Sequence, residues 1–274
     1  MARKYITQIF PWLLPIRKKQ RLFCFYTKLE LDRNHYTARQ SEILLPHRLF
    51  ETGSALYNPD TGFNMVYQEN KVFNLKLAAA KLDKLMIRPK ETFSFWKAVQ
   101  HADRDTPYKD GLTVIDGVLT TSPGGGMCQM SNLLFWLFLH TPLTIVERHG
   151  HDMKDFPDPK SDAPAGVDAT VSQGWLDLKV RNDTDAVFQI SIAFDAEHII
   201  GSIYTDTDTG RIYRVENGQP LYYRQNGAVF EEVDINQNVI SKKSGDCLSS
   251  KTLYRNKCKI GYQLPAGTPI LEKG

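Results

Sequence analysis

The chain has 274 residues, enough for a substantial core, and its length allows either one domain with appendages or two small domains. Its 42% hydrophobic and 24% charged residues are ordinary for a globular protein and exclude wholesale disorder. The net charge of +3 argues against nucleic acid as the main partner, because binding to phosphates normally requires a strongly basic domain or stripe.

The N-terminus combines a short apolar stretch at residues 9–16 with basic flanks. The stretch contains Pro11 and Pro15 and no small-residue cleavage site follows it, so it fits neither a secretory signal nor a transmembrane span. We therefore expect a cytoplasmic protein whose N-terminal segment, residues 1–69, packs on the core as a strap. The basic flanks leave a second expectation open, weak contact with an anionic membrane surface. They comprise Arg3, Lys4, Arg17, Lys18, Lys19 and Arg21.

Two elements are predicted before the middle of the chain. Apolar residues recur every three or four positions over residues 70–86, the stripe of an amphipathic helix that Pro89 ends. An Asp-Gly pair at residues 116–117 separates two short β-branched runs, which predicts a hairpin over residues 113–120.

Residues 124–129 read Gly-Gly-Gly-Met-Cys-Gln and lead into an apolar segment, residues 131–139, that predicts a core helix. Three glycines allow positive φ and close backbone approach, so they can form a tight turn that delivers Cys128 to the start of the helix. Unpaired N–H groups and the helix dipole there favour a thiolate. In the alternative interpretation, Cys128 is only a small buried hydrophobic residue.

Short strands dominate the remainder of the prediction. Residues 143–148 predict a strand with histidines at its end, and the Pro- and Asp-rich residues 155–166 predict a loop that suits a lid. Four runs separated by turn signals then predict an antiparallel meander, at residues 168–172, 175–181, 187–194 and 198–204. Weaker strand patterns at residues 211–215 and 228–233 precede a tail rich in lysine and cysteine, to which we assign no structure.

A cysteine, a histidine and an acid follow one another in the order that papain-like and transglutaminase-like thiol enzymes use. Cys128 is the candidate nucleophile, either His149 or His151 the base, and Asp168 the group that orients the imidazole. The backbone of Gly125 and Gly126 and the residue Gln129 are candidates to stabilise an oxyanion. Both histidines with the thiolate would also suit zinc, but no recognised metal spacing is present, so we expect neither metal nor cofactor.

The predicted fold class is α+β: a helix led by the glycine turn packs on a mainly antiparallel sheet. We divide the chain into the strap, a central domain at residues 70–205 and a small β-rich extension at residues 206–274. The cysteines at positions 24, 128, 247 and 258 are dispersed, so reduced thiols are expected, although Cys247 and Cys258 could close a short loop in an exported protein. Trp96, Trp136 and Trp175 are expected in the core or in a pocket wall.

Several motifs between residues 70 and 195 resemble the VanW domain. They are Glu91-Thr92-Phe93-Ser94-Phe95-Trp96, Gly111, Gly124-Gly125-Gly126-Met127-Cys128-Gln129, Glu147-Arg148-His149-Gly150-His151, Asp168-Ala169-Thr170-Val171 and Leu178-Lys179-Val180-Arg181-Asn182-Asp183-Thr184-Asp185. The resemblance implies an accessory role in glycopeptide resistance, in a system that rebuilds peptidoglycan precursors so that the drug no longer binds their termini. Many larger relatives are exported and carry a membrane anchor, which is not recognisable here.

Two functional hypotheses follow. The first is a thiol-dependent acyl-transfer or hydrolytic enzyme that acts on an amide or ester of a cell-wall peptide or peptidoglycan precursor, with Cys128 as its nucleophile. The second is a non-catalytic module that uses the same cleft to bind a wall peptide or a resistance partner. The reactivity of the Cys128 thiol distinguishes them, because only the first requires an activated thiolate.

Overall fold

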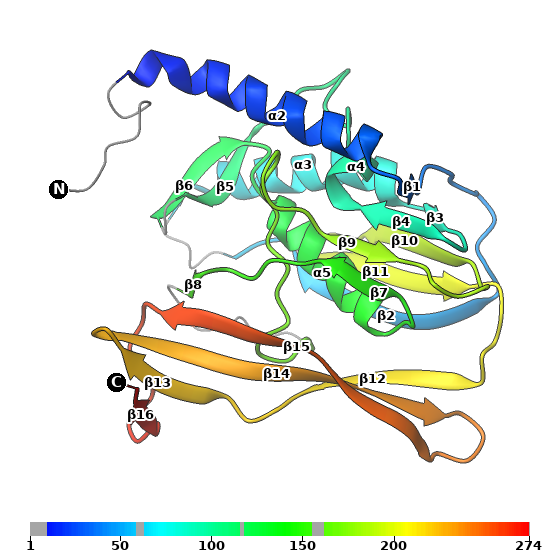
Figure 1. Ribbon diagram of the computed structural model, residues 1–274. Helices are drawn as coiled ribbons and strands as arrows, with labels where there is room; N and C mark the ends of the chain where they lie inside the picture. The colour runs from blue at the N-terminus through cyan, green and yellow to red at the C-terminus, as the bar shows by residue number, and fades with distance from the viewer. Residues whose placement is uncertain (1–9, 59–62, 116–117, 155–161, 274) are drawn as a thin grey trace.

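The computed structural model describes residues 10–58, 63–115, 118–154 and 162–273. Within these ranges, helices and mainly antiparallel sheets form the predicted α+β fold. Figure 1 shows the long C-terminal strands in a layer of their own, below the sheets that surround the central helix α5. The principal helices are α2 (Leu14–Leu31), α3 (Met65–Leu82) and α5 (Met127–Leu139). Two shorter helices are η1 (Pro11–Leu13) and α4 (Phe95–Ala98).

Helix α5 forms the centre of the core because its second half, residues 133–139, is apolar on every side. It packs on a sheet in which β10 and β11 are antiparallel neighbours, as predicted. Gly201 of β11 permits close contact, since a Cβ at this position would lie 2.9 Å from Leu137 Cδ1. In order across the sheet, the strands are β2 (His47–Ala55), β11 (His198–Thr205), β10 (Phe188–Phe194) and β3 (Met86–Ile87).

A second sheet positions the predicted histidines, and it corrects the predicted meander. Residues 168–178 form no regular strand beyond a bridge between Ser172 and Leu176, and β9 pairs with β4 and β7 rather than with β10. The reason is the buried Asn182, whose side chain holds the turn after β9 and directs the chain into the other sheet. The strands are β1 (His35–Tyr36), β4 (Glu91–Ser94), β9 (Lys179–Arg181) and β7 (Thr144–Glu147).

The first predicted helix is present but displaced towards the N-terminus. Helix α3 begins after Asn64, whose side chain accepts a hydrogen bond from the Val66 amide, and it ends at Leu82 rather than at Met86. Met86 continues the apolar stripe, yet it pairs with β10 as part of β3. Strand pairing therefore overrides the helical periodicity at this end.

The predicted hairpin consists of β5 (Asp110–Ile115) and β6 (Val118–Pro123), which pair in an antiparallel register. Its Asp116-Gly117 turn lies outside the described residues, as does most of the predicted lid, residues 155–161. Strand β6 ends directly before the three glycines, so the hairpin leads into α5.

The C-terminal extension is a mainly antiparallel sheet with β14 at its centre, to which β16 and β8 add at the two edges in parallel. The tail that was not assigned from the sequence forms one of its longest strands, β15. Cys247 and Cys258 lie eleven positions apart on this extended strand, a separation of roughly 35 Å, so they cannot bond to each other. The strands are β12 (Arg211–Asn217), β13 (Leu221–Gln225), β14 (Ala228–Ser241), β15 (Cys247–Ile260), β16 (Ile270–Glu272) and the short β8 (Met153–Lys154).

The N-terminal residues contribute to the fold through β1, β2 and one face of α2, where Leu29 is buried. None of the described helices is long and apolar enough to cross a membrane. Trp96 and Trp136 are buried as predicted, but Trp175 is 66% exposed. Its exposure follows from its place in the irregular loop that replaces the predicted strand.

Candidate active site

The glycine turn between β6 and α5 has the backbone geometry that only glycine adopts readily. Gly124 and Gly126 have φ angles of 79° and 108°, in the left-handed region. Gly125 lies against β5, where a Cβ would be 2.2 Å from the carbonyl oxygen of Gly111. The buried Asn74 secures the turn by donating a hydrogen bond of 3.0 Å to the Gly125 carbonyl. These constraints fix the point at which α5 begins.

Cys128 is the second residue of α5 and lies in its first turn. The side chain is half-buried, and its sulfur lies 3.2 Å from Thr170 Oγ1 and 3.6 Å from the carbonyl oxygen of Val171. The sulfur therefore has polar neighbours instead of a closed shell of aliphatic groups.

His151 and Asp168 form a close pair next to this thiol. Nδ1 of His151 lies 2.9 Å from both carboxylate oxygens of Asp168, and the backbone N–H of His151 donates to Oδ2 at 2.6 Å. The imidazole also interacts with the Cys128 thiol, and this interaction shifts the pKa of both groups. Because Nδ1 is hydrogen-bonded to Asp168, Nε2 is the ring nitrogen that can exchange a proton with the sulfur.

The pair shifts the titration of the thiol and the imidazole in opposite directions. Burial raises the pKa of Cys128, but the hydrogen bonds from His151 and Thr170 outweigh it and leave the pKa below its ordinary value. Hydrogen bonds to Asp168 and to Cys128 raise the pKa of His151 to about 10. These shifts favour a thiolate facing an imidazolium, which is a nucleophile beside a proton donor.

Helix α5 also holds the segment that carries the acid. The side chain of Asn132 accepts a hydrogen bond of 2.6 Å from the Ala169 amide, and Ser131 Oγ donates to the Ala169 carbonyl at 2.5 Å. Thiol and carboxylate are thus attached to one rigid helix, although they are forty residues apart in sequence.

The residues predicted to stabilise an oxyanion differ in whether their N–H groups are already hydrogen-bonded. Gln129 donates its side-chain amide to Ser54 Oγ at 2.9 Å and to the Ala55 carbonyl at 2.7 Å, so this amide is engaged with β2. The Gly125 amide donates to the Ser122 carbonyl. Within the described part of the chain, the amides of the predicted Gly126 and of Met127 and Cys128 meet no acceptor, as is usual at the start of a helix. These three N–H groups are the donors available to an oxyanion.

The two histidines do not share a site. His149 directs Nε2 towards Glu147 at 3.1 Å, and Lys179 donates to the other oxygen of that carboxylate at 2.8 Å. Strand β7 ends at Glu147, so the alternation that would align both rings does not extend to His149 and His151. A zinc site would require both rings around one point. The described residues contain no group of three or more His, Cys, Asp or Glu placed to hold a metal ion.

Comparison with known proteins places the sequence in a family. The model of the family described as "VanW like protein" matches residues 70–204. The vancomycin B-type resistance protein VanW of Enterococcus faecalis strain V583 is 55% identical over 272 residues, 99% of either chain. The chain belongs to the VanW-like family. The uncharacterised protein YoaR of Bacillus subtilis strain 168 is 32% identical over 157 residues, which cover 57% of this chain and 48% of YoaR.

No solved structure matches the chain significantly. The VanW-like region contains every residue of the Cys128, His151 and Asp168 arrangement. It also contains two contributors that sequence reasoning missed, Thr170 beside the sulfur and Arg148, which donates to the Asp168 carbonyl at 2.5 Å. Thr170 and Arg148 both lie inside motifs that carry the VanW resemblance. Their place in these motifs is the feature of the sequence that could have indicated a role in the site.

A third contributor lies outside the VanW-like match. Asn256 of β15 is buried and accepts a hydrogen bond of 2.6 Å from the Arg148 guanidinium, which also stacks 4.4 Å from the ring of Tyr254. Tyr254 in turn donates to the Gly166 carbonyl at 3.1 Å. The C-terminal sheet therefore supports the loop that carries Asp168, and no local pattern in β15 indicates this.

Proposed function

We propose that this chain is an accessory protein of vancomycin resistance and that it acts as a cysteine-dependent acyl transferase or hydrolase. The resistance role rests on 55% identity, over almost the whole chain, to a protein whose name states it. The chemistry rests on one observation: His151, whose Nδ1 is held by Asp168 at 2.9 Å, interacts with the Cys128 thiol so that the pKa of the thiol falls. The proposed substrate is an amide or ester of a cell-wall peptide or peptidoglycan precursor.

The proposed reaction has two steps. The Cys128 thiolate attacks a carbonyl carbon, and the oxyanion that forms accepts hydrogen bonds from the free amides of Met127 and Cys128. The carbon–nitrogen or carbon–oxygen bond then breaks, and Nε2 of His151 gives its proton to the departing amine or alcohol. Water or an amine next attacks the thioester and passes a proton to His151, which regenerates the thiolate and releases the product.

Asp168 has a positioning role in this scheme. Its carboxylate accepts hydrogen bonds from the backbone N–H and from Nδ1 of His151, which fixes the ring and stabilises the imidazolium. Its own pKa is lowered, because the hydrogen bonds and positive charge of His151 outweigh the effect of burial. The acid therefore remains ionised while the imidazole gains and loses its proton.

Replacement of the thiol tests the proposal directly. In a vancomycin-resistant host whose own copy is deleted, Cys128→Ser should remove the contribution of the protein to the minimum inhibitory concentration, because a serine hydroxyl is not deprotonated at neutral pH. Cys247→Ser, at an exposed cysteine on β15, should retain it. Immunoblots and circular dichroism would check that both variants fold and accumulate. Full resistance with a well-folded Cys128→Ser protein would favour a non-catalytic binding module instead.

A further inference from the structure

Helix α2 has one face that binds the protein body and an opposite face that binds nothing among the described residues. Its inner face holds the buried Leu29, while Tyr26 donates to the Trp96 carbonyl at 3.5 Å. With 100° between successive residues, positions 16, 20, 23, 27 and 31 fall within about 40° of one line along the helix, about 160° around the axis from Leu29. Figure 1 shows α2 lying along the outside of the molecule, so this outer face meets solvent.

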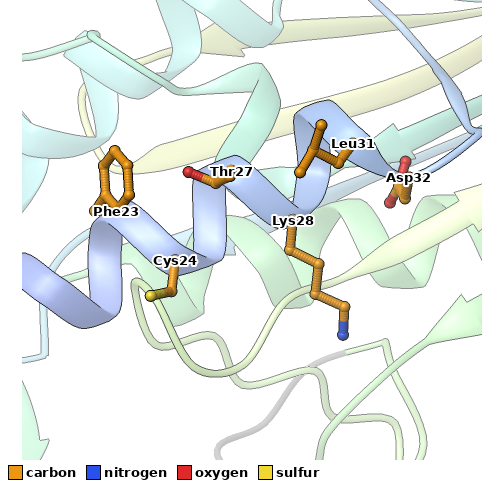
Figure 2. Close-up of a pocket in the computed structure, with 6 residues that line it drawn as sticks. All are labelled: Phe23, Cys24, Thr27, Lys28, Leu31 and Asp32. Atoms are coloured by element: carbon orange, nitrogen blue, oxygen red, sulfur yellow. The ribbon is translucent and has the colours of Figure 1, made fainter.

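Three of these five positions carry large apolar side chains in contact with solvent, beside the polar Gln20 and Thr27. Ile16, Phe23 and Leu31 are 56%, 72% and 78% exposed. Figure 2 shows a hollow on this face whose lining comes entirely from α2 and the residue that follows it. The lining residues are Phe23, Cys24, Thr27, Lys28, Leu31 and Asp32.

Positive charge borders the apolar stripe. Helix α2 contains five basic residues and one acidic residue, Glu30, which forms an ion pair with Lys97 of α4. The net charge of the whole chain is only +3, so the basic charge is concentrated on this helix. Arg17, Arg21 and Lys28 follow one edge of the stripe at helical spacing. The exposed Trp175 lies at the same helix, with its ring 5.8 Å from the Arg21 guanidinium.

We propose that the outer face of α2 docks on the surface of a lipid bilayer that contains anionic phospholipids. An apolar stripe bordered by lysine and arginine is the pattern of a helix lying in the plane of a membrane interface: the apolar side chains enter the acyl boundary and the basic ones meet the phosphates. The charge of α2 complements that surface. Trp175 adds an indole ring, a group that favours the interface. The inference is independent of the thiol chemistry.

Vesicle flotation tests the proposal with the full chain. The protein should float with vesicles of phosphatidylglycerol mixed with phosphatidylcholine, roughly ten-fold better than with phosphatidylcholine alone, and high salt should weaken the binding. Phe23→Ser combined with Leu31→Ser should reduce binding about ten-fold. Ile212→Ser combined with Leu271→Ser, at comparably exposed apolar positions on β12 and β16, should leave it unchanged.

A second pair of variants tests the charges without touching the apolar stripe. Arg17→Gln with Lys28→Gln should weaken binding to the anionic vesicles, whereas Lys243→Gln with Lys251→Gln, at exposed positions of the C-terminal sheet, should not. Equal binding to both kinds of vesicle would overturn the proposal, as would binding that survives the Phe23/Leu31 change. The proposal would also be overturned if the protein formed a dimer in the absence of vesicles and the Phe23/Leu31 change dissociated that dimer. In that case a second copy of the chain would cover the outer face of α2.

Discussion

His149 and His151 are separated by one glycine, yet their rings meet different carboxylates. His151 hydrogen-bonds to Asp168 and shifts the pKa of the thiol, whereas His149 lies against Glu147, which is already paired with Lys179. An imidazole can relay a proton for a nucleophile only if one nitrogen reaches it and the other is held. Only His151 meets both conditions, which makes it the proposed base.

Asp168→Asn tests the positioning role. The amide removes the negative charge that favours the imidazolium, so we expect the pKa of Cys128 to rise and its alkylation at pH 7 to slow about ten-fold or more. Asp152→Asn, at a nearby exposed carboxylate, should leave the rate unchanged. The measurement is the rate of iodoacetamide modification of the Cys128 peptide by mass spectrometry. An unaltered rate in the folded Asp168→Asn protein would remove the acid from the mechanism.

At the scale of elements, the glycine turn forces α5 to begin where the thiol lies in its first turn. Gly125 packs against the backbone of Gly111, so the contact leaves no room for a side chain. Gly125→Ala should therefore lower the free energy of unfolding by roughly 1 to 3 kcal/mol, the usual cost of overpacking. Gly53→Ala, where the nearest atom is 3.7 Å from the added Cβ, should change it little. Urea denaturation measures both, and equal stabilities would contradict this account of the turn.

The elements that sequence predicted well are those whose signals are local. The hairpin, the glycine turn and the apolar α5 each follow from neighbouring residues, and these place Cys128 at a helix start. The meander failed because the side chain of Asn182 separates β9 from β10 through contacts with Ile87 and Ala186. The base stayed ambiguous because the alternation of β7 stops at Glu147. The pairing of β9 and the choice of base depend on tertiary contacts, and the periodicity of the sequence carries no information about these contacts.

In the whole molecule, the C-terminal sheet supports the candidate site from outside the VanW-like region. Strand β8 continues from the His151 segment and pairs with β15, while Asn256 and Tyr254 of β15 hold Arg148 over the Asp168 loop. This linkage predicts that the reactivity of the thiol depends on a strand far away in sequence. The division of the chain into strap, central domain and C-terminal extension remains a prediction. The contacts of β15 with Arg148 and the Asp168 loop give a reason for the extension to accompany the central domain.

Asn256→Ala tests this linkage. It leaves the buried Arg148 guanidinium without its acceptor, so we expect a loss of about 1 to 3 kcal/mol in unfolding free energy together with slower Cys128 alkylation. Asn256→Asp should restore both, because a carboxylate accepts the same hydrogen bond. Thr252→Ala, at an exposed position on the same strand, serves as the control. If Asn256→Ala loses stability but alkylates at the normal rate, the sheet stabilises the fold without tuning the site.

The measurement that bears most directly on the account is the pH dependence of Cys128 alkylation in the native protein and in His151→Ala. The native thiolate should form at a pH below the ordinary thiol pKa of roughly 8.5, so the alkylation rate should fall only as the pH drops through this lowered pKa. Removal of the imidazolium should move the midpoint upwards. Identical midpoints in the two proteins, or a native midpoint at or above 8.5 or so, would contradict a thiolate–imidazolium pair at this site.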